Sequence, residues 1–71
     1  MADAPLRKFL RLPAVEAAIG KKKSWLYRAV EAGEFPRPIK IGSATVVWDA
    51  AEIGAWQAQR IAERDQAAAD A

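Results

Sequence analysis

Residues 20–30 read Gly-Lys-Lys-Lys-Ser-Trp-Leu-Tyr-Arg-Ala-Val, and this stretch decides the fold of the chain. The glycine is expected to end one helix, the three lysines open the next, and that second helix carries larger apolar side chains mainly on one side. Such a helix can present a positively charged N-terminus to a phosphate backbone while its apolar side packs on the core. The stretch therefore predicts a helix-turn-helix, and its charge indicates nucleic-acid binding, with DNA favoured over RNA.

Two helices are predicted around this stretch. The first is expected over 13–19, with Pro13 in its first turn and Gly20 as a left-handed C-terminal cap. The second is expected over 22–32 and is ended by Gly33. Only a short turn separates the two helices, as in a helix-turn-helix.

A short β-hairpin is predicted after the second helix. Pro36 and Pro38 exclude helix and favour an extended path. Apolar residues then alternate in 39–41 and 46–48, on either side of a turn at 42–45. This hairpin is the predicted wing of the domain.

The alternation in the hairpin also predicts which residues face the core. Ile39 and Ile41 are expected on one face of the ribbon, with Val46 and Trp48 opposite them. Val47 is then expected to point outward, and an exposed valine on a wing is unusual. We therefore expect Val47 to be available for contact with another protein.

A final helix is predicted after the hairpin. Asp49 and Glu52 have the spacing of a capping box, and Ile53, Trp56 and Ile61 form a stripe that is expected to dock on the core. The Ala-rich, weakly acidic residues that follow have no expected packing partner. We therefore expect a flexible N-terminal arm over 1–9, one domain over 10–62 and a disordered C-terminal tail over 63–71.

Composition limits the classes of protein. The 71 residues have room for one small domain, whose thin core is helped by three tryptophans. There is no cysteine and no histidine, which excludes disulfides, thiolate or imidazole metal ligands, and nucleophiles paired with histidine. The acidic residues are scattered, so we predict no catalytic residue, metal, cofactor or small-molecule ligand, and an enzyme has very little support.

No apolar run approaches the roughly 20 residues that cross a bilayer, and no apolar signal core is present. We expect a soluble cytoplasmic protein associated with the nucleoid and not with membranes.

Charge is distributed unevenly along the chain. Residues 1–40 carry nine Lys and Arg against four Asp and Glu, a net charge of +5. Residues 41–71 carry two against five, a net charge of −3. A basic half in so small a domain is a candidate footprint for a polyanion.

Helical periodicity separates two sides of the second helix. The side expected to face the core holds Lys23, Leu26, Tyr27 and Val30. The outward side holds a set that solvation alone explains poorly: Lys21, Ser24, Trp25, Arg28 and Ala32. Two interpretations of Trp25 stay open, because this ring either meets a partner or folds back onto Leu10 or the first helix.

Arg28 and the lysines are candidate DNA contacts. The planar fork of Arg28 can take guanine O6 and N7 together or clamp a phosphate. The alternative is a surface ion pair of Arg28 with Glu31 or Glu34, which is worth only about tenths of a kcal/mol. Positive charge near a helix N-terminus is unfavourable, and Lys22 stands where an oxygen-bearing N-cap is preferred, so a bound external anion would explain the lysines.

Several spaced features are shared with a known family: Arg11-Leu12, Gly20, Ser24, Leu26-Tyr27-Arg28, Gly33, Phe35-Pro36-Arg37-Pro38, Lys40-Ile41-Gly42, Trp48, Glu52-Ile53 and Ala55-Trp56. With them, residues 10–60 resemble the AlpA family of small phage-type regulators and, more distantly, excisionases and MerR-type domains. The resemblance implies a mainly α fold with a small β-hairpin, a winged helix-turn-helix of the MerR/excisionase type in a single small domain.

The resemblance also implies where DNA lies. Residues implied to face the major groove are Lys22, Lys23, Ser24, Trp25 and Arg28. Residues implied to lie near the backbone or minor groove are Lys40 and the wing tip from Ser43 to Thr45, with Arg37 able to reach phosphates. The family often has serine where this chain has Lys22 and threonine where it has Trp25. It also often has arginine where this chain has Ala44, and the lack of that arginine argues against minor-groove insertion of the wing. Together with Lys21, the expected DNA-binding residues are Lys21, Lys22, Lys23, Ser24, Trp25, Arg28, Arg37, Lys40, Ser43 and Thr45.

The expected function is sequence-specific binding of double-stranded DNA. The resemblance implies a transcriptional regulator or a recombination directionality factor (excisionase) of a phage or integrative element, with RNA polymerase or an integrase as protein partner. Cooperative self-association on DNA is expected, because one recognition helix and a small wing offer little surface for specificity. The alternative is a protein-interaction adaptor that uses exposed Trp25 and Val47 and has no direct role on DNA.

Overall fold

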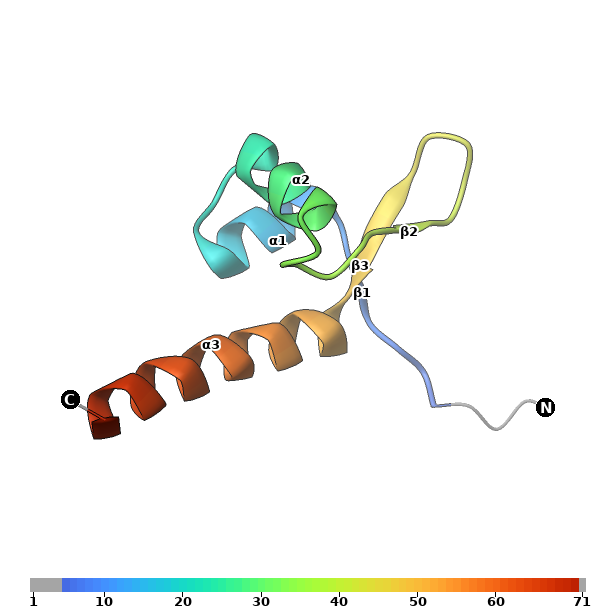
Figure 1. Cartoon of the computed structure of the whole chain (residues 1–71). Coiled ribbons are helices and arrows are strands. Elements are labelled where there is room, and N and C mark those ends of the chain that lie inside the picture. The colour runs from blue at the N-terminus through green and yellow to red at the C-terminus, as the bar shows by residue number, and fades with distance from the viewer. Residues whose placement is uncertain (1–4, 71) are drawn as a thin grey trace.

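Three helices and a small antiparallel sheet make up residues 5–70, the part of the chain that this computed structural model describes (Figure 1). The elements in chain order are β1 (Phe9–Leu10), α1 (Leu12–Ile19), α2 (Lys23–Glu31), β2 (Ile39–Lys40), β3 (Val46–Asp49) and α3 (Ala50–Asp70). The predicted fold class is confirmed, since a helix-turn-helix is followed by a hairpin wing and a further helix.

The predicted helix ends are confirmed at both glycines. Gly20 has a φ of 73° and donates its N–H to the carbonyl oxygen of Glu16, at 2.8 Å. Gly33 has a φ of 76° and lies just beyond α2. L side chains rarely adopt this left-handed conformation, so glycine ends a helix at little cost. Lys22 is the N-cap of α2, with extended backbone and no hydrogen bond from its side chain.

The sheet has three strands, in the order β1-β3-β2, and both neighbours run antiparallel to the central β3. The register pairs Leu10 with Trp48 and Phe9 with Asp49. The first of these strands was not predicted, because two residues are too few for an alternating pattern to be visible. Phe9 was assigned to a flexible arm, whereas it is paired in the sheet; residues 1–4 of that arm lie outside the described residues.

The prediction for Val47 was wrong. The register places Ile39 directly opposite Val47, so these two side chains share a face, and Val47 is only 2% exposed. Ile41 lies past the end of β2 and is exposed. The prediction assumed a two-stranded ribbon, but β1 makes β3 a central strand with a neighbour on each side.

Every helix and the central strand contribute to one core. Its buried members are Val15, Leu26, Ala29, Phe35, Trp48 and Ile53. The indole of Trp48 is fully buried and donates its Nε1–H to the carbonyl oxygen of Pro36, at 3.0 Å. This hydrogen bond satisfies the polar atom of the ring and fixes the loop between α2 and the wing.

Asp49 caps α3, as its spacing to Glu52 predicted. Its Oδ1 accepts the N–H of Ala51 at 2.9 Å, and its Oδ2 forms an ion pair with Arg7. The Arg7 hydrogen bond is the main cause that lowers the pKa of this carboxyl, and burial partly opposes it. The cap therefore joins the start of α3 to the segment that leads into β1.

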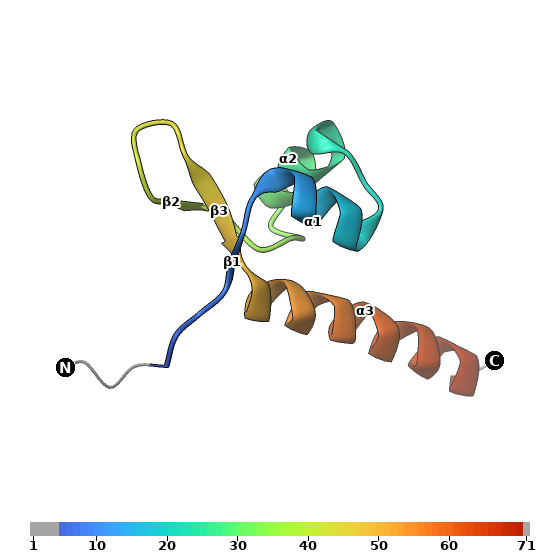
Figure 2. The same ribbon diagram turned by 180° about the vertical axis from the view of Figure 1, so that it is seen from behind.

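The far half of α3 differs from the expected disordered tail. The helix runs through Asp70, and its residues 58–70 are exposed, including Ile61, which was expected to dock on the core. Figure 2 shows this half extending away from the rest of the molecule. Side-chain pairs within the helix hold it, such as Arg60 with Glu63 at 2.5 Å. Residue 71 lies outside the described residues.

Candidate nucleic-acid interface

The N-terminus of α2 is a cluster of exposed positive charge. Lys21 and Lys22 follow the Gly20 cap, Lys23 is the first residue of α2, and all three side chains are exposed. No acidic residue lies in the first turn of α2. The first N–H groups of a helix have no partner within the helix and favour an anion. The cluster therefore has the geometry of an anion-binding helix end.

Arg28 is free of the ion pairs that were its alternative explanation. The ion pairs within residues 5–70 join Arg7 to Asp49, Arg60 to Glu63 and Arg64 to Asp65. Arg28 is exposed and lies with Ser24 along a shallow hollow on the outer side of α2. Neither Glu31 nor Glu34 forms an ion pair with Arg28, although Glu31 lines the same hollow.

Trp25 does not face outward. The buried side of α2 is therefore rotated about the helix axis relative to the side that periodicity predicted. Trp25 is half-buried, and its ring makes edge contacts with Phe35 and Trp56 at centroid distances of 6.3 and 6.5 Å. Ala29, which was not expected on the core side, is buried, whereas Lys23 is exposed. The cause is α3, which brings Trp56 to a side of α2 that periodicity alone marks as outward.

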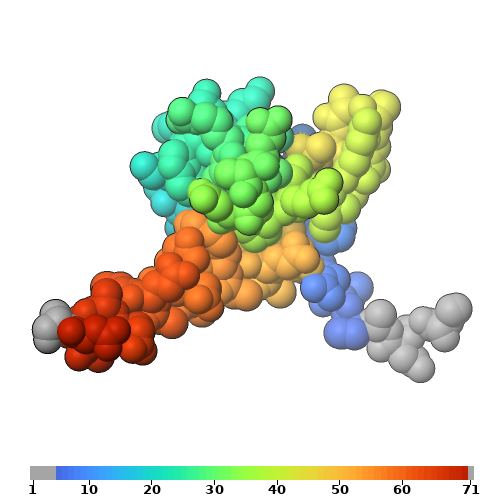
Figure 3. Space-filling model, in the orientation of Figure 1, coloured from blue at the N-terminus to red at the C-terminus, as the bar shows by residue number. Residues whose placement is uncertain are grey.

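The wing and α2 project to the same side of the molecule, away from α3 (Figure 1). The space-filling view shows the two as neighbouring protrusions above α3 (Figure 3). Lys40 and Ser43 on the wing are exposed, and Thr45 is half-buried, with its carbonyl oxygen accepting the N–H of Ile41 at 2.9 Å. The two elements that carry most of the predicted residues, α2 and the wing, therefore lie on the same side of the molecule.

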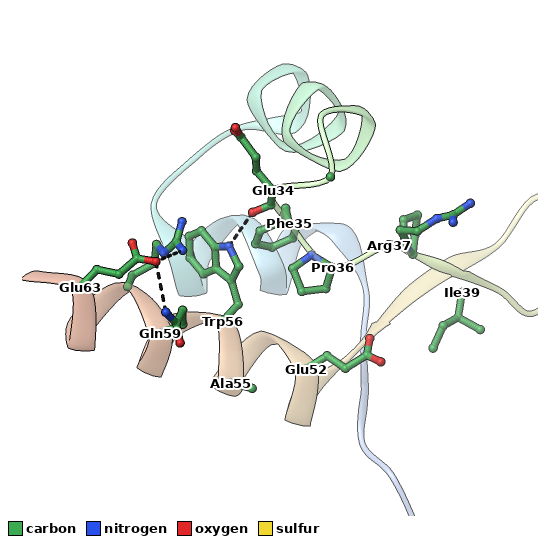
Figure 4. A pocket seen from close by; sticks show the side chains of 13 residues that line it. Glu34, Phe35, Pro36, Arg37, Ile39, Glu52, Ala55, Trp56, Gln59 and Glu63 are labelled. Atoms are coloured by element: carbon green, nitrogen blue, oxygen red, sulfur yellow. Dashed lines mark hydrogen bonds and ion pairs between the residues drawn. The ribbon is translucent and has the colours of Figure 1, made fainter.

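Arg37 lies in a different setting, in the loop that joins α2 to the wing. Figure 4 shows the hollow between residues 33–39 and α3, with the guanidinium of Arg37 directed away from Trp56. Trp56 donates its Nε1–H to the carbonyl oxygen of Glu34 at 2.8 Å, which ties this loop to α3. The hollow is lined by both acidic and basic side chains, so it lacks the uniform positive charge of the α2 end.

Phe35 and Trp56 were missed as residues that shape this interface. They decide the direction of Trp25, although they lie 10 and 31 residues farther along the chain. Their apolar character was visible in the sequence, but their contact with Trp25 depends on how α3 packs.

Residues 5–70 contain neither a metal-binding cluster nor a membrane-spanning helix. Histidine, cysteine and acidic side chains form no group there that could hold a metal ion. Among the described helices, none combines the length and apolarity that a membrane span requires.

The fold and the basic end of α2 define a winged helix-turn-helix protein. The chain belongs to the AlpA family, since the family model described as "Prophage CP4-57 regulatory protein (AlpA)" matches residues 8–61. It is also similar to an uncharacterized protein, ORF88, of Enterobacteria phage P4, with 38% identity over 64 residues that cover 90% of this chain and 73% of the phage protein. No solved structure gives a significant match. The family is one of prophage regulatory proteins, which confirms the resemblance found in the sequence.

Proposed function

We propose that this chain binds double-stranded DNA in a sequence-specific manner as a regulator of a phage or integrative element. In this proposal α2 enters the major groove, where Ser24 and Arg28 face base edges and Lys22 and Lys23 contact the phosphates at the groove edge. Lys21, Arg37, Lys40, Ser43 and Thr45 lie near phosphates, and the protein works in the cytoplasm on nucleoid DNA. The observation that carries the proposal is the exposed lysine cluster at the N-terminus of α2, with Arg28 on the same helix in no ion pair within residues 5–70.

The charge arrangement favours DNA over a protein partner. Positive charge at a helix N-terminus destabilises the free protein, whereas a phosphate there is bound by the lysines and the free N–H groups together. The adaptor alternative depended on outward-facing Trp25 and Val47. Val47 is buried and Trp25 packs on two other aromatic rings. Neither of the two residues that the adaptor alternative needed is therefore exposed for contact with a protein partner.

The salt dependence of binding tests this function. If the six cations Lys21, Lys22, Lys23, Arg28, Arg37 and Lys40 make roughly four to six phosphate contacts, log K falls against log salt with a slope of about −4 to −5. Fluorescence anisotropy with a labelled duplex measures the slope. Replacing the three lysines by glutamine makes the slope shallower by about 2 to 3, whereas Arg64→Gln on the far half of α3 leaves it unchanged. A wild-type slope shallower than about −2 excludes the lysine cluster from the mechanism.

Regulation of transcription and control of recombination share this mode of binding. In the first, the bound protein recruits or blocks RNA polymerase; in the second, it organises DNA for an integrase. A footprint beside an integrase attachment site favours the recombination role, and a footprint over a promoter favours the transcriptional role.

A further inference from the structure

Trp25 lies between the lysine cluster and α3. One side of its ring meets Phe35 and Trp56, and those two rings contact each other at a centroid distance of 4.9 Å. Trp56 is itself anchored by its hydrogen bond to Glu34. The indole of Trp25 is therefore held by both the loop and α3, and its position is set by the core and not by solvent.

Lys21 covers this same ring from outside. Its Nζ lies 5.3 Å from the ring centroid, within the range of a cation–π interaction. Lys21 takes part in none of the ion pairs within residues 5–70, and its ammonium instead lies over the indole face of Trp25. Lys22 and Lys23 make no such ring contact in the described part of the chain. Among the three lysines of the cluster, Lys21 is thus the one whose ammonium is held by a ring, that of Trp25.

We infer that Trp25 is a positioning residue that holds the ammonium of Lys21 at the N-terminus of α2 for contact with a DNA phosphate, and that Trp25 does not read a base. The inference rests on the proposed function and concerns how its interface is built. A free lysine loses side-chain entropy when it is ordered on a phosphate. A lysine already held over a ring loses less on binding, because part of that cost is met during folding.

A phosphate contact carries no sequence information, so this role has a specific signature. The loss of Trp25 weakens binding to all duplexes alike, and only while Lys21 is present. A base-reading tryptophan would instead change the preferred sequence. A ring that merely fills space would be replaced equally well by an aliphatic side chain of similar size.

A double-mutant cycle on full-length protein tests the inference with a random-sequence duplex as probe. Trp25→Leu keeps apolar bulk and removes the aromatic face, and it is expected to weaken binding about two- to fivefold, as does Lys21→Ala. In the double variant the loss is no larger than in Lys21→Ala alone. Trp25→Phe keeps an aromatic face and retains most of the affinity. Arg60→Ala removes the equivalent cation from the ring of Trp56 and leaves DNA affinity unchanged.

NMR of the free protein supplies a readout that does not depend on DNA. The side-chain ε-protons of Lys21 are expected to be shifted upfield by the ring in the wild type and in Trp25→Phe, and not in Trp25→Leu. If Trp25→Leu fails to fold, the wild type, Trp25→Phe and Lys21→Ala still decide the question. An unshifted Lys21, additive losses in the cycle, or a changed base preference on selection from a random duplex pool overturns the inference. A wild type without salt-sensitive DNA binding overturns the proposed function, and the NMR shift then still reports whether the Lys21–Trp25 contact exists.

Discussion

Arg28 and Lys22 lie on the same helix but are expected to act differently on DNA. Lys22 is the N-cap residue of α2, where the proposal places a phosphate, and Arg28 lies on the exposed side that would enter the groove. Phosphate contacts position a protein, whereas bidentate contacts to base edges specify sequence. The two side chains therefore separate the two components of recognition.

Lys22→Ala is expected to weaken binding about equally on a cognate site and on random DNA. Arg28→Ala is expected to cost about 1–3 kcal/mol on the cognate site and to flatten the preference at one base pair. Titrations of each variant against both duplexes measure the difference. Equal losses on the two DNAs for Arg28→Ala would reduce this residue to a backbone contact.

Asp49 makes the stability of the fold depend on acid. The carboxyl is buried, caps α3 and pairs with Arg7, and this pairing lowers its pKa below the usual 3.8. A lowered pKa in the folded state means that the contribution is present above the unfolded pKa and is lost as pH falls through the folded one. The folded protein is therefore expected to lose stability as pH drops below about 4.

Asp49→Asn keeps an oxygen for the cap but loses the charge. Its thermal midpoint is expected to fall less steeply than that of the wild type between about pH 5 and pH 2, because the Arg7 ion pair no longer titrates. Arg7→Gln is expected to behave similarly, and Arg60→Gln, whose ion pair is exposed, serves as the control. Parallel pH curves for wild type and Asp49→Asn would rule out this ion pair as a source of acid sensitivity.

At the scale of the elements, the glycine inside α3 and the glycine that follows α2 are expected to respond in opposite ways to replacement by alanine. Gly54 lies inside α3 with open space around the position of an added Cβ, whereas Gly33 has a left-handed backbone after α2. An alanine removes backbone freedom from the unfolded chain in both cases. Only at Gly33 does it also force a side chain into a disfavoured conformation.

Gly54→Ala is expected to stabilise the protein by about 0.5–1 kcal/mol, which corresponds to a rise of a few degrees in thermal midpoint. Gly33→Ala is expected to destabilise it by about 1–2 kcal/mol. Thermal unfolding followed by circular dichroism measures both changes. A destabilised Gly54→Ala variant would show that α3 meets a close neighbour in solution.

At the scale of the whole molecule, size limits what one copy can do. One recognition helix and a small wing bury only about 600–1,000 Å² on DNA. The Cα atoms extend 47 Å along the longest axis, which exceeds the about 34–36 Å of one turn of DNA. We expect copies on neighbouring sites to contact one another, with the exposed far half of α3 as the surface for these contacts, because Val47 is buried.

We expect a protein that is monomeric at micromolar concentration and binds adjacent sites cooperatively. Titration of one isolated site against two adjacent sites compares the steepness of the isotherms. Ile61→Gln, on the exposed half of α3, is expected to reduce cooperativity while leaving the affinity for an isolated site unchanged. Equal affinity per site in the wild type would exclude cooperative loading.

The sequence by itself determined the features that depend on neighbouring residues, namely the helix ends, the helix cap and the exposed charges. Gly20 and Gly33 end their helices because only glycine adopts the left-handed backbone freely, and Asp49 caps α3 because its carboxylate reaches a nearby N–H. Lys21 and Arg28 were also identified correctly as exposed, since charged side chains on a short helix seldom find room inside so small a core. Lys23, which periodicity placed on the core side, is exposed for the same reason.

Contacts between distant segments are what only the tertiary structure decided. Val47 is buried on the face of the sheet that it shares with Ile39, and Trp25 turns inward because α3 brings Trp56 to it. Helical and strand periods assign side chains to faces, but they do not say which element covers each face. Which element covers a given face depends on how the three helices and the sheet pack together. In this protein the packing turns Trp25, an expected DNA contact, toward the core, with Lys21 over its ring.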